Sequence, residues 1–118
     1  MANDDPCGEA QHLPVNMFEA SDAVVVIAPM PAVMADDLHV SVEGRTLTIK
    51  ADCRTEAPKE YLLHEWHYGP YERQLELPEG FHGDAEATFG NGQLALRVRK
   101  GEANGDGART VSVAAKGT

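Results

Sequence analysis

The chain has 118 residues, the usual length of one folded domain, and its 42% hydrophobic and 25% charged residues are ordinary for a globular protein. No apolar stretch approaches the roughly 20 residues that a membrane-spanning helix needs. With 19 acidic against 10 basic residues the net charge is -9, which repels phosphate backbones and anionic lipids. Nucleic acid and membranes are therefore not expected as partners.

The N-terminal residues predict a short polar arm over residues 1–13. This stretch lacks the basic and apolar regions of a secretory signal, so we expect a cytoplasmic protein. The two cysteines, Cys7 and Cys53, lie far apart and lack the paired spacing of zinc sites. Neither a disulfide framework nor a metal site is expected.

From residue 15 onward, apolar and polar residues alternate with the period of a half-buried strand. A first strand is predicted to begin with Val15, Met17 and Phe18. The continuous apolar run over residues 23–28 predicts a strand buried on both faces, and Pro29 should end it.

Two hairpins are the strongest local predictions. Residues 38–51 alternate on either side of a turn at Gly44, and residues 85–98 alternate on either side of Gly90-Asn91-Gly92. Residues 61–68 favour a strand over a helix, and residues 71–77 share one phase before a proline. The pattern predicts an all-β fold, an immunoglobulin-like antiparallel β-sandwich of seven to eight strands.

The C-terminal residues allow two interpretations. Residues 101–107 are rich in glycine and predict a flexible linker, and Arg109-Thr110-Val111-Ser112-Val113 follows it. The last three residues are either a frayed tail or a strand whose two valines, on one face, add to an exposed sheet edge. The flexible linker would let this segment reach a neighbouring chain, and both interpretations stay open at this point.

Residues suited to metal or acid–base chemistry are few and scattered: His39, Cys53, His64, Glu65, His67 and His82. His64 and His67 would point to opposite faces of a strand, which makes joint metal ligation awkward. The sequence also lacks the nucleophile, zinc-hydrolase and nucleotide-binding motifs. We therefore expect no enzyme activity, no cofactor and no metal.

Arg73 is more informative than the histidines. It lies in phase with Tyr71, Leu75 and Leu77, so it should point toward a packed or shared face. A buried guanidinium requires an acceptor. Either the side chain extends to the rim, or it meets a carboxylate such as Glu65 or one on another subunit.

Three segments together carry a recognisable pattern. They are LHVSVEG with LTI at 38–49, YERQLELP at 71–78 and ATFGNGQL at 87–94. The second is similar to the F-x-R-x-f-x-L-P pattern, and the third to the A-x-x-x-n-G-x-L pattern, of the α-crystallin domain of small heat-shock proteins. Residues 14–100 therefore resemble that domain, and Val111-Ser112-Val113 resembles the family's I-x-I/V anchor, within a C-terminal extension over residues 101–118.

The resemblance implies an ATP-independent holdase chaperone that binds unfolding proteins and prevents their aggregation. It implies a homodimer with possible higher assembly, and it carries over no catalytic residue. A p23-like co-chaperone, or another protein-interaction β-sandwich module that binds a folded partner, is the alternative. A metal-dependent enzyme is the weakest hypothesis.

The resemblance also implies three groups of contact residues. The dimer interface would include Val15, Met17, Phe18, Tyr61, Leu62, Leu63, His64 and Arg73. The oligomer anchor would be Val111 and Val113. These valines would insert into a groove on a neighbouring dimer, lined by Leu38, Val40, Val42, Ala85, Ala87 and Phe89.

The sequence departs from the family pattern at a few positions. Pro31-Ala32 stands where the family has Pro-Gly, Gln93 replaces an apolar residue, and Arg99-Lys100 stands where Pro-Lys is common. The family's N-terminal arm is often longer and rich in aromatic residues. In this chain the predicted arm is short and polar, and Leu13 is its one large aliphatic residue. Such an arm favours dimers or small oligomers over large assemblies.

Overall fold

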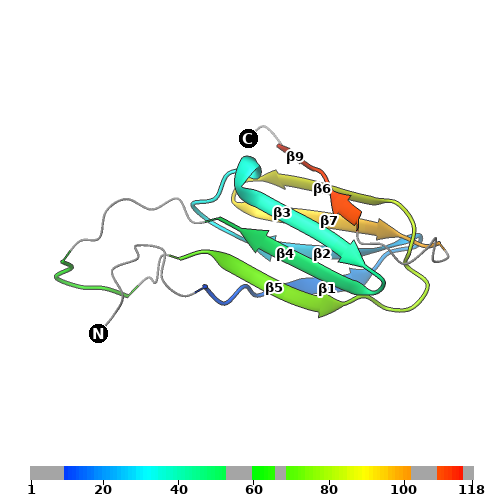
Figure 1. Cartoon of the computed structure of the whole chain (residues 1–118), viewed down its shortest axis with the longest axis horizontal. Helices are drawn as coiled ribbons and strands as arrows, with labels where there is room; N and C mark the ends of the chain where they lie inside the picture. The colour runs from blue at the N-terminus through cyan, green and yellow to red at the C-terminus, as the bar shows by residue number, and fades with distance from the viewer. Residues whose placement is uncertain (1–9, 53–59, 66–68, 102–108, 116–118) are drawn as a thin grey trace.

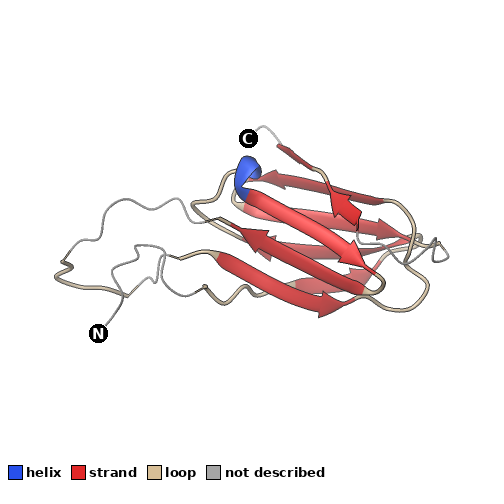
Figure 2. Ribbon diagram, in the orientation of Figure 1, coloured by secondary structure: helices blue, strands red, loops and turns tan. Residues whose placement is uncertain are grey.

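The computed structural model describes residues 10–52, 60–65, 69–101 and 109–115. Strands dominate these residues (Figure 2), and they form two sheets that stack face to face (Figure 1). The prediction of an all-β, immunoglobulin-like sandwich is confirmed. The described residues contain nine strands rather than seven or eight, because the C-terminal segment divides into two short strands.

The two sheets have five and four strands. In spatial order the first contains β1 (Asn16–Glu19), β2 (Ala23–Pro29), β7 (Gln93–Arg99), β6 (Ala85–Gly90) and β9 (Val113–Ala115). The second contains β5 (Tyr71–Glu76), β4 (Thr46–Ala51), β3 (Leu38–Glu43) and β8 (Arg109–Val111). A short 3-10 helix, η1 (Ala35–Asp37), leads into β3. Neighbouring strands pair antiparallel except β6 and β9, which are parallel.

Both predicted hairpins are confirmed. β3 pairs with β4, and β6 pairs with β7, each through a two-residue turn. The turns need positive φ angles, which tight hairpins favour because the turn then follows the strand twist. Gly44 has a φ of 61°, while Asn91 and Gly92 have φ of 55° and 72°. Gly44 and the Asn91-Gly92 pair therefore mark the turns in the sequence because these residues adopt the positive φ angles that the turns need.

The core lies between the sheets and follows the predicted alternation. The inward-facing side chains of β2 and β7 and those of β3 and β4 form one buried cluster. Leu47, Ile49, Leu94 and Leu96 are completely buried. Burial of one such aliphatic side chain contributes about 1.5–3 kcal/mol, so this cluster holds the two sheets together.

The prediction that residues 23–28 are buried on both faces is wrong for the outer face. Val24 and Val26 are buried, but Val25 and Ile27 are only half-buried. They face outward from a sandwich of two layers, and no further layer among the described residues covers them. β2 ends at Pro29, as predicted, and includes this proline as its last residue, where it removes only a terminal hydrogen bond.

Leu13 belongs to the core, although the sequence placed it at the end of a polar arm. Its side chain is 0% exposed and packs in the same cluster as the strand residues. Residues 1–9 lie outside the described part of the chain, so the arm itself stays a prediction. The chain thus joins the folded domain before β1 begins.

The predicted strand over residues 61–68 is not formed in residues 60–65, which are described as bends and loop. Residues 66–68 lie outside the described part. A strand needs a hydrogen-bonding neighbour, and residues 60–65 pair with no strand of this chain among those described. In Figure 1 this segment extends well away from the sandwich.

Candidate functional site

β1 forms an open edge of the larger sheet. It pairs with β2 on one side, and its other side has no strand among the described residues. All four of its residues are exposed, including Met17 and Phe18. An edge strand with unpaired backbone groups and exposed apolar side chains is suited to pairing with another strand.

Residues 61–63 form the most exposed apolar segment of the described chain. Tyr61, Leu62 and Leu63 are 56%, 107% and 74% exposed. His64 stacks on Tyr61, with ring centroids 4.5 Å apart and planes inclined by 16°. Consecutive large apolar side chains in water are unfavourable and usually mark a surface that another molecule covers. We name residues 60–65 the arm segment.

The N-terminal residues before β1 hold the base of the arm segment. The Gln11 backbone N–H donates to the Pro70 carbonyl at 2.6 Å, and its side-chain Nε2 donates to the Gly69 carbonyl at 2.6 Å. Gln11 also forms a parallel bridge with Tyr71. These contacts fix the point where the chain returns from the arm segment into β5.

Arg73 donates from one guanidinium nitrogen to the backbone carbonyl of Leu13 at 2.8 Å. The two predicted alternatives were a carboxylate partner and extension to the rim. In the described part of the chain the acceptor is instead a main-chain carbonyl, and the side chain is half-buried. Burial of the Leu13 side chain in the core brings its carbonyl within reach of one guanidinium N–H. Sequence reasoning could not anticipate this acceptor, since backbone carbonyls carry no sequence signal.

The predicted dimer-interface residues therefore lie in two places. Met17 and Phe18 line the β1 edge, with Val15 half-buried just before it. Residues 61–64 lie on the arm segment. Arg73 lies on β5, which borders the same side of the sandwich as β1 (Figure 1). The meeting of these surfaces across two copies of the chain stays a prediction.

The predicted groove lies between β3 and β6, at the opposite side of the sandwich from β1. Its lining side chains are buried or, at Ala85, half-buried: Leu38, Val40, Val42, Ala85, Ala87 and Phe89. The tail of the same chain occupies it. Val111 pairs with Val40, and Val113 pairs with Ala87. The predicted groove and anchor residues are thus brought together within one chain, and docking onto a neighbouring dimer stays a prediction.

The tail divides its pairing between the two sheets. β8 adds antiparallel to β3, whereas β9 adds parallel to β6, and Ser112 lies at the crossing. Val111 is buried, Val113 is half-buried, and Ser112 is exposed. The two valines therefore differ in burial: the side chain of Val111 is buried in the core, and that of Val113 is only partly buried. We name residues 109–115 the tail strand segment.

Residues 16–114 match the sequence profile of the Hsp20/alpha crystallin family. The chain belongs to this family. It is 36% identical over 95 residues to the 23.2 kDa heat shock protein of Oryza sativa subsp. japonica, covering 73% of this chain and 44% of that protein. It is 31% identical over 77 residues to small heat shock protein C2 of Rickettsia felis, covering 62% and 50%. The chain thus spans about half the length of the curated relatives it matches.

Solved structures of the family share the fold. The hspA protein from Xanthomonas axonopodis superposes with a TM-score of 0.69 at 24% identity, over 81% of this chain and 100% of that one. A small heat-shock protein from Xylella fastidiosa gives a TM-score of 0.65 at 24% identity, over 79% and 89%. These relatives and solved structures are small heat-shock proteins by name, which agrees with the expectation that this chain is not an enzyme.

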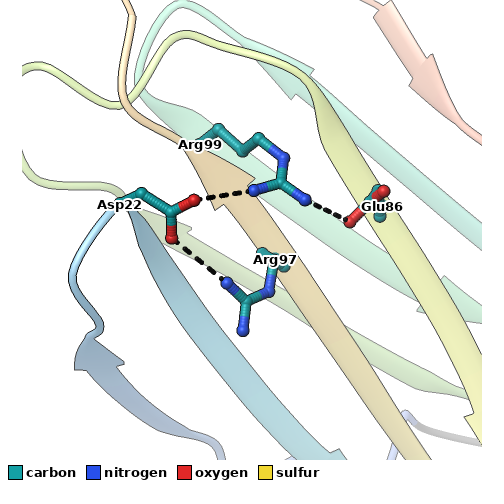
Figure 3. Close-up of polar contacts among 4 residues, drawn as sticks. All are labelled: Asp22, Glu86, Arg97 and Arg99. Carbon is teal, nitrogen blue, oxygen red and sulfur yellow. Dashed lines mark hydrogen bonds and ion pairs between the residues drawn. The ribbon is translucent and has the colours of Figure 1, made fainter.

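A charged cluster covers part of the outer face of this Hsp20/alpha crystallin domain (Figure 3). Asp22, in the turn before β2, pairs with Arg97 at 3.4 Å and with Arg99 at 2.8 Å. Arg99 also reaches Glu86 of β6 at 3.1 Å. All four side chains are at least 39% exposed, so each pair contributes at most about 1 kcal/mol. The cluster joins a turn to two strands and is explained by that structural role.

The histidines do not form a metal site among the described residues. No group of three histidine, cysteine or acidic side chains there is arranged to hold an ion. His39 instead lies 3.0 Å from Asp52 on the surface, while Cys53 and His67 lie outside the described part. Within that part, no helix of this Hsp20/alpha crystallin domain is long and apolar enough to cross a bilayer.

Proposed function

We propose that this protein is an ATP-independent holdase that binds unfolding proteins and prevents their aggregation. The observation that carries the proposal is the exposed apolar run Tyr61, Leu62 and Leu63 on the arm segment. Burial of apolar surface is worth about 25 cal/mol per Å², and unfolding proteins offer apolar surface of the same kind. The net charge of -9 would keep such a particle from precipitating with its own copies.

The same surfaces support a homodimer. The arm segment of one copy would pair along the open β1 edge of a second copy, and the exchange would be reciprocal about a two-fold axis. This pairing would supply the hydrogen-bonding neighbour that residues 60–65 lack in the single chain. It would also cover Met17 and Phe18, which the isolated chain exposes. Separation of the two copies would then present both apolar surfaces to clients.

Family membership favours the holdase over the p23-like or general interaction module that the sequence left open. The exposed arm segment points the same way, because a module that recognises a folded partner has no need for a detached apolar segment. Assembly beyond the dimer and a cytoplasmic location stay predictions. The expected clients are extended apolar segments of partly unfolded proteins.

The test is a heat-aggregation assay without ATP, followed by light scattering from an aggregating test protein. The chain should suppress aggregation at near-stoichiometric ratios. The double variant Leu62→Asp and Leu63→Asp should lose this suppression and become monomeric by mass measurement, because charge on both leucines opposes apolar contact. Met34→Asp is the matched control, since Met34 is similarly exposed at 58% but lies away from the arm segment.

Two results would contradict the proposal. Failure of the unmodified chain to suppress aggregation at any ratio would remove the holdase activity. Equal suppression by the arm-segment variant and by Met34→Asp would show that the exposed leucines are not the capture surface. Retention of the dimer in the arm-segment variant would separately exclude the proposed pairing with β1.

A further inference from the structure

Two edge strands lie on the same side of the sandwich (Figure 1). Among the strands of the described chain, β1 pairs only with β2, and β5 pairs only with β4. An edge strand offers unpaired N–H and C=O groups with which a strand of another chain can pair. The homodimer proposed above uses β1, although β5 lies close to it on the same side. The two edges differ in what covers them.

The first part of β5 is covered by residues 10–14, which we name the guard segment. The Gln11 N–H donates to the Pro70 carbonyl, and the Gln11 Nε2 donates to the Gly69 carbonyl, both at 2.6 Å. Gln11 also forms a parallel bridge with Tyr71, the first residue of β5. On its other side Tyr71 is already paired with β4. Both sides of β5 are thus occupied at Tyr71, so a strand of another chain cannot pair there.

A second contact, two residues further along, continues the same register. The Leu13 carbonyl accepts a hydrogen bond from Arg73 at 2.8 Å, across a sequence separation of 60 residues. Gln11 and Tyr71 have the same separation, so the guard segment runs parallel to β5 over this stretch. The Leu13 side chain is 0% exposed in the core and anchors the guard segment. Pro14 follows and has no N–H with which to extend the pairing.

The rest of β5 carries acidic side chains on its exposed face. Glu72 and Glu76 are exposed, and an antiparallel pair of β5 strands centred on Gln74 would place each Glu72 opposite a Glu76. Like charges directly opposite each other destabilise strand pairing. Arg45 compensates only part of this charge, because it lies 3.9 Å from Glu76. β1 differs, since no strand of the described chain covers its outer edge and only one of its four residues is acidic.

From these observations we propose that the guard segment determines which edge a second copy can use. It closes β5, so the arm segment of the second copy pairs with β1, the edge that stays open. Gln11 is the positioning residue, because it holds the guard segment on β5 through both its backbone and its side chain. The direction of the arm segment to β1 rests on the proposed homodimer, whereas closure of β5 within one chain does not.

Cross-linking at β5 tests whether the guard segment closes this edge. The full chain would carry Gln74→Cys in a background with Cys7→Ser and Cys53→Ser. A short bis-maleimide would link the thiols of paired copies before a denaturing gel. Gln74 is exposed and lies beyond the guard segment, and with Gln11 in place we expect only monomers. Gln11→Pro removes the backbone N–H and the side-chain amide, so the yield of covalent dimers should rise several-fold.

Further variants serve as controls. Gln11→Ala keeps the backbone donor and loses only the side-chain bond, so it should give an intermediate yield, and it carries the test if Gln11→Pro does not fold. Thr48→Cys places the thiol one strand further in, opposite Gln74 on the same face, and should give no dimers in any of these chains. High salt screens the acidic side chains of β5, so it should raise the yield of Gln11→Pro and leave the chain with Gln11 unchanged.

Two results would overturn the inference. Covalent dimers as the main product of Gln74→Cys with Gln11 in place would mean that β5 is already open. Equal yields with and without the Gln11 substitutions would mean that Gln11 does not close this edge. A monomeric mass for the unmodified chain would refute the proposed homodimer, yet the comparison of cross-linking yields would still decide whether the guard segment closes β5.

Discussion

Replacement of Ala32 by glycine should stabilise this protein, although glycine usually destabilises a folded chain. Ala32 has a φ of 69° in the turn after Pro31, where family members carry glycine. A proline followed by a residue with positive φ fits a type II turn, whose second central position favours glycine. The alanine side chain is exposed, so it contributes little packing that the substitution would remove.

The sign of the effect follows from two opposing magnitudes. An L-residue in the left-handed region is disfavoured by roughly 1–2 kcal/mol, because its Cβ crowds the following carbonyl oxygen. Glycine removes that cost but adds conformational freedom to the unfolded chain, worth about 0.4–1 kcal/mol. The difference leaves Ala32→Gly more stable by about 0.5–1 kcal/mol.

Urea denaturation at one fixed protein concentration would measure the change. With a slope of about 1–3 kcal/mol per M, the midpoint for Ala32→Gly should rise by a few tenths of a molar unit. Ala95→Gly is the matched control, because Ala95 lies within β7 and has no positive φ. Its midpoint should fall, since glycine in a strand interior costs roughly 0.5–1 kcal/mol. Equal falls for both variants would refute the reasoning about Ala32.

Three further substitutions test other contacts. Leu13→Ala should lower the free energy of unfolding by about 2–5 kcal/mol because it leaves a cavity in the core, whereas exposed Met34→Ala should change it little; equal urea midpoints would place Leu13 outside the core. Gly83→Ala should cost about 1–3 kcal/mol by thermal unfolding, because its Cβ would lie 2.6 Å from the Lys100 carbonyl; an unchanged melting temperature would contradict that contact. Arg73→Met should cost about 1.5–3 kcal/mol in urea, the value of a hydrogen bond from a charged group, and a loss below 0.5 kcal/mol would show that the bond is dispensable.

The sequence predicted the hairpins well because their signals are local. In β3 and β4, buried and exposed residues alternate with the period of the backbone itself. Gly44 and the Asn91-Gly92 pair supply the positive φ angles that tight turns need. Alternation and turn chemistry lie within a few residues of each other, so no knowledge of distant contacts was required.

The candidate site was harder to predict, because its contacts join distant parts of the chain. Leu13 appeared as an isolated leucine among polar residues, and only the fold shows that it fills the core and accepts a hydrogen bond from Arg73. The arm segment has the composition of a strand, but whether it forms one depends on a partner edge. The valines of the tail indicated docking, whereas the strand edges with which they pair, β3 and β6, lie far away in the sequence.

The position of β8 and β9 along the chain has a consequence for biosynthesis. They follow every other described strand, so a ribosome makes them after the rest of the sandwich. While translation continues, the sheet edges at β3 and β6 are uncovered, and nascent copies on adjacent ribosomes of one message present identical uncovered edges to each other. Until β8 and β9 have been made, the edges of β3 and β6 therefore lack the strands that cover them in the folded chain.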